Sequence, residues 1–124
     1  SQGLVENGAK LHNTGRRINV LEETAKNIEG LIPLPMGATS RYSTANALGI
    51  IEERGKLHIL VNNAGMLPNA PYVSDKSIPE NATLGASLFK DQSFEDLNAT
   101  FTANTSSPFF VTCAFLALLE KGAR

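Results

Sequence analysis

The stretch from Lys56 to Gly65 constrains the fold more than any other part of the chain. It reads Lys-Leu-His-Ile-Leu-Val-Asn-Asn-Ala-Gly, an apolar run that ends in two amides, a small residue and a glycine. Because its apolar residues do not alternate strictly with polar ones, the run predicts a strand covered on both faces, as in a parallel sheet between helices. The amides of Asn62 and Asn63 can satisfy backbone groups where this strand leaves the sheet.

Strand and helix patterns alternate before this run. The expected elements are the tail of a helix at 1–8, a strand at 9–14, an amphipathic helix at 18–30, a strand at 31–36, a helix at 39–54 and the strand at 57–62. Pro33 and Pro35 lack N–H groups and confine the strand at 31–36 to a sheet edge. The alternation predicts an α/β fold with parallel strands and right-handed crossovers, in a single domain over residues 1–124.

The second half begins with a stretch at 66–92 that has three prolines and no periodicity, which predicts a loop. Ser93 is the expected cap of the final helix. On that helix Phe94, Leu97, Phe101 and Asn104 fall on one face by spacing, so Asn104 is expected to be the polar member of an inward stripe. Its amide either serves a site or bonds to neighbouring backbone, and both interpretations stay open.

Residues 109–119 are apolar on nearly every side, which predicts a helix buried on two sides. Cys113 is then a small buried hydrophobe, and no apolar run approaches the length that spans a bilayer. The whole chain is 42% hydrophobic and 19% charged with a net charge of −1. We therefore expect neither a nucleic-acid nor a membrane partner. The lone cysteine excludes an internal disulfide and favours the cytoplasm.

Asn62-Asn63-Ala64-Gly65 resembles the signature after the fourth strand of the short-chain dehydrogenase/reductase family. The resemblance implies a partial Rossmann-like, doubly wound parallel sheet of about three strands with flanking helices. It also implies that Asn62, Ala64 and Gly65 lie at a nicotinamide cofactor, with no metal. The family places an active-site Asn in the setting of Asn104, where it holds a water linked to a catalytic Lys.

Arg16 and Arg17 follow the predicted strand at 9–14, where the family uses an acid to favour NAD or an arginine to favour NADP. The resemblance therefore implies NADP, with Arg16 as the first phosphate contact and Arg17 as the second. The alternative is that both arginines are solvated surface at the start of the next helix. Gly37 and Ala38 replace the Asp-Val pair usual in the family, which weakens the case for the cofactor.

Two chemical parts of the family pattern are absent from the 124 residues. No Thr-Gly-x-x-x-Gly turn occurs, and no helix carries the catalytic Tyr and Lys after a catalytic Ser. Tyr72 and Lys76 have the Tyr-x-x-x-Lys spacing, but they lie among prolines and follow Asn63 too closely, so we reject them. We expect a fragment or degenerate relative of an NADP-dependent enzyme that is inactive alone. The alternative is a non-catalytic binding or self-assembling module.

The family's strand order implies a gap, because its first strand lies between the second and the fourth. Either residues 9–14 pair directly with residues 57–62, giving the order 3-2-4, or a strand from another chain fills the gap. We favour direct pairing. We also expect a homo-oligomer that associates through the helix at 109–119 or through strand edges.

Overall fold

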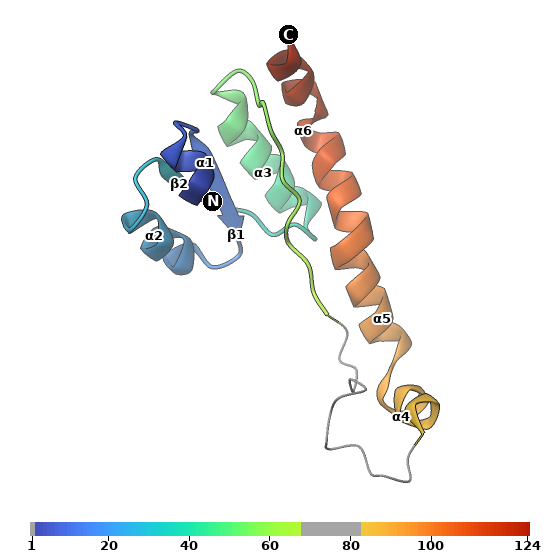
Figure 1. Cartoon of the computed structure of the whole chain (residues 1–124). Helices are drawn as coiled ribbons and strands as arrows, with labels where there is room; N and C mark the ends of the chain where they lie inside the picture. Colours follow the sequence, from blue (N-terminus) through green and yellow to red (C-terminus); the bar gives the residue numbers. More distant parts are fainter. Residues whose placement is uncertain (1, 68–82) are drawn as a thin grey trace.

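The computed structural model describes residues 2–67 and 83–124 (Figure 1). The elements in chain order are α1 Gln2–Glu6, β1 Leu11–Gly15, α2 Ile18–Lys26, β2 Leu31–Pro35, α3 Arg41–Glu52, α4 Leu84–Asp91, α5 Phe94–Phe101, the π-helical turn η1 Thr102–Ser106 and α6 Ser107–Ala123. The α/β class is confirmed, with helix and strand boundaries close to those expected in the first half. Tyr72 and Lys76 lie outside the described residues.

The sheet of the described chain has two parallel strands, β1 and β2, in a register from Leu11 opposite Leu31 to Gly15 opposite Pro35. The prediction of about three strands is wrong in this part of the chain. Residues 57–62 are extended but join no sheet, and their expected pairing with β1 does not occur. The backbone N–H of Leu57 instead donates to the carbonyl oxygen of Leu118 in α6 at 3.0 Å.

Helices lie on both sides of the two strands, α2 on one side and α3 with α6 on the other (Figure 1). Leu21 of α2 is buried beside Gly15, where an added Cβ would lie 3.3 Å from Leu21 Cδ2. The main core lies on the α3 and α6 side and comprises Leu34, Met36, Ala47, Ile51, Val111, Phe115 and Leu118. The two parallel strands are thus flanked by helices, with the core built where β2, α3 and α6 meet.

Short polar side chains cap the starts of three helices. The expected cap, Ser93, is confirmed, since its Oγ accepts a hydrogen bond from the Asp96 N–H of α5 at 3.0 Å. Ser40 caps α3, since its Oγ accepts a hydrogen bond from the Ser43 N–H at 3.2 Å. Thr83 caps α4 in the same way, with Ala86 as donor at 3.2 Å. The prediction of a loop over all of 66–92 is therefore wrong at α4, where Thr83 before Leu84 was a usable cap signal.

α5, η1 and α6 form one continuous helix, Phe94–Ala123, of 30 residues. Pro108 does not break it, because the missing proline N–H falls next to a turn whose bonding already departs from the α pattern. This helix is long enough and apolar enough to cross a membrane. Core helices of soluble proteins meet the same two criteria of length and composition. The expectation that no apolar run approaches the length of a bilayer is wrong for this helix, because the sequence did not show that α5, η1 and α6 join into one.

The expected burial of this long helix is wrong on two counts. Phe94 and Phe101 are 87% and 61% exposed, and Asn104 is also exposed, so the stripe does not face inward. α5 extends beyond the end of the sheet in Figure 1 and finds no core there. On α6 the buried face is narrow, whereas Phe109 is 63% exposed and Cys113 is also exposed. Within the described residues α6 is covered on one side only.

Candidate functional site

Asn104 and Met66 are joined by two hydrogen bonds between the long helix and the chain that follows the extended segment. The Met66 N–H donates to Asn104 Oδ1 at 2.8 Å, and Asn104 Nδ2 donates to the Met66 carbonyl oxygen at 2.7 Å. The side-chain amide thus pairs with the backbone as a neighbouring strand would. One N–H and one acceptor site of the Asn104 amide remain for a further partner such as a water.

Gly65 lies directly against this amide. A Cβ built on Gly65 would lie 3.1 Å from Asn104 Oδ1, closer than an ordinary van der Waals contact. The structure therefore brings two of the predicted site residues together, Gly65 and Asn104. It also supplies a specific reason for glycine here, which is close approach rather than a positive φ angle.

Asn62 is held from the same helix. Its Nδ2 donates to Thr112 Oγ1 at 3.0 Å, so the amide links residues 57–64 to α6. Its expected bonding to local backbone groups does not occur among the residues that the structure describes. A groove lies between β1 and residues 57–64. Asn63 and Ala64 are exposed and line one end of it. Together these contacts fix the Asn-Asn-Ala-Gly run at two points, through Thr112 and through Asn104.

Arg16 lies at the carboxyl end of β1 and is exposed. The aliphatic part of the Arg16 side chain lies beside Gly37, where an added Cβ would be 3.7 Å from Arg16 Cγ. Arg17 is the N-cap residue of α2 without a side-chain capping bond. Within residues 2–67 and 83–124 neither guanidinium has a hydrogen-bond or ion-pair partner. Both arginines are available to an anion, although neither lines the groove that Asn62, Asn63 and Ala64 border.

A dinucleotide would fit these residues only in part. The Arg16 guanidinium is suited to a phosphate on the ribose, and Gly65 permits close approach. A pyrophosphate needs backbone N–H donors at a glycine-rich turn that follows a strand. The positive-φ glycines of the described chain, Gly8, Gly30 and Gly55, instead follow helices and lie before strands or before the extended segment. No described group of three or more His, Cys, Asp or Glu residues could hold a metal ion.

Histidine and arginine side chains border the same groove at its other end. His12 Nε2 is buried without a hydrogen-bond partner in the described chain. Burial lowers the pKa of His12 below its ordinary value of 6.5, and the charge of Arg54 lowers it further. His12 is thus held in its neutral form over more of the pH range. Sequence reasoning missed it because a single histidine in a strand carries no motif.

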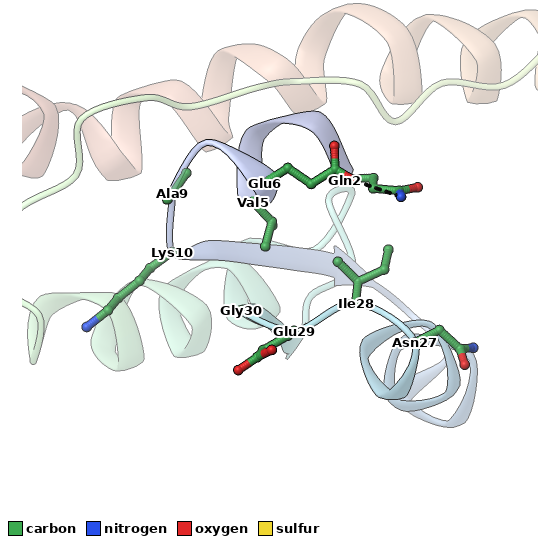
Figure 2. A pocket seen from close by; sticks show the side chains of 10 residues that line it. Gln2, Val5, Glu6, Ala9, Lys10, Asn27, Ile28, Glu29 and Gly30 are labelled. Atoms are coloured by element: carbon green, nitrogen blue, oxygen red, sulfur yellow. Dashed lines mark hydrogen bonds between the residues drawn. The ribbon is translucent and has the colours of Figure 1, made fainter.

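A second hollow of about 480 Å³ lies at the amino end of the sheet, between α1 and the turn before β2 (Figure 2). Val5 and Gly30 both line it and lie in contact, since a Cβ added at Gly30 would be 3.0 Å from Val5 Cγ1. Gln2 closes part of its rim through a 2.9 Å hydrogen bond to Glu6. It is at the opposite end of the strands from Arg16, Gly65 and Asn104, and none of the predicted site residues borders it.

Parallel strands, crossover helices and polar residues at the carboxyl ends of the strands define part of a doubly wound, dinucleotide-binding type of α/β fold. The sequence profile described as short chain dehydrogenase matches residues 1–124, and the chain belongs to that family. It is 38% identical over 126 residues to the short-chain dehydrogenase/reductase SAT3 of Stachybotrys chartarum, and 35% identical over 127 residues to VdtF of Byssochlamys spectabilis. Each alignment covers 98% of this chain, which spans only 45% and 42% of the two relatives.

Solved structures agree on the fold. The Pseudomonas aeruginosa RhlG/NADP complex matches 98% of this chain with a TM-score of 0.75 at 21% identity, and the chain covers 42% of it. Serine dehydrogenase from Escherichia coli matches 96% of this chain with a TM-score of 0.72 at 23% identity, and the chain covers 48% of it. The Rossmann-like prediction is therefore confirmed as a structural likeness, over less than half of each complete domain.

Sequence reasoning missed several residues that position the site. Met66 acts through its backbone, so its side-chain type carries no signal. Thr112 interrupts the apolar run 109–119 and could have been singled out as the one hydroxyl on that face. Ser107 is buried at 5% exposure, and its hydroxyl donates to the Ala38 carbonyl oxygen at 2.6 Å. It was harder to recognise from sequence, because it is one of several serines and threonines before Pro108.

Proposed function

We propose that these 124 residues are the central portion of an NADP-dependent short-chain dehydrogenase/reductase, and that by themselves they contact part of the cofactor without turnover. The observation that carries the proposal is the position of Arg16 at the carboxyl end of β1. Its guanidinium is exposed and has no partner among the described residues, and β1 and the two arginines that follow it include no acidic residue. A carboxylate there would select a free ribose, whereas a guanidinium selects a ribose phosphate.

The Asn-Asn-Ala-Gly run, which borders the same groove as β1, supports the same proposal. Its position is fixed by Asn104 and Thr112, so Ala64 and Gly65 present a preformed edge to a ligand. NADP, when bound, supplies the hydride acceptor. The residues of this chain would hold and orient it: Arg16 at the ribose phosphate, Gly65 by permitting close approach, and Asn104 by fixing the Gly65 backbone and holding a water.

A nucleotide that carries only the recognised phosphate tests the proposal. We expect adenosine 2′-phosphate to bind more tightly than adenosine 5′-phosphate in an NMR titration, with amide shifts concentrated around Arg16. A charged hydrogen bond contributes about 1.5–3 kcal/mol, so Arg16→Gln should weaken the 2′-phosphate at least tenfold. Arg17→Gln should weaken it less. Lys26→Gln, the same loss of charge at the far end of α2, is the matched control.

Equal affinity for the two nucleotides, or an Arg16→Gln variant with unchanged affinity, would contradict NADP selection. The expected lack of turnover is checked separately by following NADPH absorbance with a panel of carbonyl compounds. Oxidation of NADPH by the purified 124-residue chain would show that the catalytic part of the proposal is wrong.

A second candidate function, a self-associating module, is favoured by the exposed apolar face of the long helix. Phe109 and Leu116 are 63% and 49% exposed on α6. Contiguous apolar surface of this kind is typical of protein interfaces. We expect a homo-oligomer by light scattering, and a shift to monomer in Phe109→Ser combined with Leu116→Ser. Phe89→Ser on α4, where Phe89 is 91% exposed, is the control that should leave the oligomer intact.

A further inference from the structure

The turn that follows β2, at residues 37–40, lies beside the side chain of Arg16 and is held by side chains of two helices. The Gly37 N–H donates to Ser43 Oγ of α3 at 2.8 Å. The Ala38 carbonyl oxygen accepts a hydrogen bond from the buried hydroxyl of Ser107 at 2.6 Å. These two bonds fix the position of the turn relative to both α3 and α6.

Gly37 leaves open space between two polar side chains. A Cβ added there would lie 3.7 Å from Arg16 Cγ and 3.9 Å from Ser43 Oγ, both ordinary van der Waals distances. The φ angle of Gly37 is not positive, so its backbone conformation does not require glycine. What glycine provides here is therefore the missing side chain, which would otherwise occupy the space that borders Arg16 and Ser43.

Ser43 has a hydrogen-bond donor without an acceptor in the described chain. A serine hydroxyl can donate one hydrogen bond and accept two. Ser43 Oγ accepts the Gly37 N–H, and no described group accepts its own hydrogen. The side chain is half-buried in the first turn of α3, so packing and the Gly37 bond hold the hydroxyl in place. It is thus an ordered neutral donor near the unpaired guanidinium of Arg16.

A phosphate is the group that such a pair of donors suits. It carries several acceptor oxygens, so one oxygen can accept from a guanidinium while another accepts from a hydroxyl. Hydrogen bonds to a charged acceptor are about twice as strong as those between neutral groups. The Arg16 guanidinium supplies the charge, and the Ser43 hydroxyl supplies a second, fixed direction for a hydrogen bond.

We propose that Ser43 is a second donor to the ribose phosphate that Arg16 binds, and that Gly37 determines whether this phosphate is accepted. The inference rests on the proposed function and adds α3 to a site that so far involved only the end of β1 on this side. It also gives a role to Gly37, which stands where the family usually has an aspartate. Loss of the side chain at this position enlarges the phosphate site.

An NMR titration of the 124-residue chain with adenosine 2′-phosphate and adenosine 5′-phosphate tests the role of Ser43. Ser43→Ala should weaken the 2′-phosphate about tenfold, as expected for a lost hydrogen bond to a charged group, and should leave the 5′-phosphate unchanged. Ser43→Thr keeps the hydroxyl and should restore the affinity for the 2′-phosphate. If Ser43 only supported the turn, Ser43→Ala would weaken both nucleotides equally.

Gly37→Val tests the space independently of the hydroxyl. The variant retains the backbone N–H that bonds to Ser43, and its side chain fills the position beside Arg16. We expect a loss of affinity for adenosine 2′-phosphate at least as large as that of Ser43→Ala. Gly85→Val on α4 adds the same side chain where nothing lies within 4 Å of an added Cβ, and it should bind like the parent chain.

The outcomes separate this inference from the proposed function. If Arg16→Gln weakens the 2′-phosphate while Ser43→Ala and Gly37→Val do not, the ribose-phosphate site stands and the roles of Ser43 and Gly37 are overturned. If Arg16→Gln has no effect, the proposed function fails and this inference fails with it. An equal loss for both nucleotides in Ser43→Ala would also overturn the inference, because it would show a purely structural role.

Discussion

Gly122 of α6 lies directly against the backbone of Leu57. A Cβ added at Gly122 would lie 2.7 Å from the Leu57 carbonyl carbon and 3.1 Å from the Cα of His58. The neighbouring hydrogen bond from the Leu57 N–H to the Leu118 carbonyl oxygen fastens the same two segments. The end of α6 and the start of residues 57–64 are thus in backbone contact, with no room for a side chain between them.

Gly122→Ala is therefore expected to destabilise the protein even though alanine favours helices. The methyl group meets backbone atoms that cannot rotate away, and overpacking of this kind costs about 1–3 kcal/mol in the free energy of unfolding. Urea denaturation followed by circular dichroism measures it. Gly49→Ala in α3 is the matched control, because nothing lies within 4 Å of its added Cβ. That variant should gain about 0.5–1 kcal/mol; similar effects at both positions would contradict the close contact.

Asn104→Ala should destabilise the attachment of Met66 to the long helix. The variant loses two hydrogen bonds, and each contributes about 0.5–1.5 kcal/mol net. Hydrogen exchange at the Met66 amide should accelerate along with the drop in unfolding free energy. Asn98→Ala on α5, which replaces another exposed asparagine, supplies the comparison. If Met66 exchanges at the same rate in both variants, the amide pairing does not hold the segment.

The stability of the protein should fall as the solution is acidified through the range of His12. Its pKa is lowered in the folded state by burial and by Arg54, so between that pKa and 6.5 the unfolded chain binds a proton that the folded chain does not. The contribution is fully present above pH 6.5 and is lost as the pH falls through the folded pKa. Urea unfolding at several pH values should show this slope. His12→Gln should reduce the slope, and an unchanged slope in this variant would contradict its assignment to His12.

Ser107→Ala should weaken the contact between α6 and the turn after β2. The buried Ser107 hydroxyl donates to Ala38 at 2.6 Å, and its loss leaves a carbonyl unpaired at a cost of about 1–3 kcal/mol. Ser106→Ala one residue earlier, where no capping bond is made, should change the unfolding free energy much less. Differential scanning calorimetry measures the melting temperatures of the two variants. Equal melting temperatures would contradict a stabilising role for the Ser107 hydrogen bond.

Local patterns in the sequence predicted much of the first half of the fold. The prolines of β2, like the Ser93 cap in the second half, act within a few residues, so the sequence shows their effect directly. The extended segment at 57–62 was predicted as a strand because its composition is that of one. Whether it pairs depends on what lies beside it, and the described chain places a groove there.

The site, like the fold, was predictable in its residues but not in all of its contacts. Gly65 and Asn104 were both named from sequence and do meet. Their bonding to Met66 and that of Asn62 to Thr112 depend on the angle at which the long helix crosses the segment. That angle is set by tertiary packing. Arg16 was named as a phosphate contact, and its role in binding stays a prediction.

The π-helical turn Thr102–Ser106 acts as a one-residue insertion in an otherwise continuous helix. One additional residue advances the helix by about 100° around its axis. By sequence spacing alone, two rows of apolar residues should share one face of the helix: Phe94, Leu97 and Phe101 in α5, and Val111, Phe115 and Leu118 in α6. The first three are nevertheless exposed and the last three are buried. Deleting one residue from this turn would restore a regular α-helix but leave the two rows out of phase, because the π turn already accommodates the additional residue. Rewinding the same residues as α-helix, without a deletion, is the change that would bring the two rows toward one face.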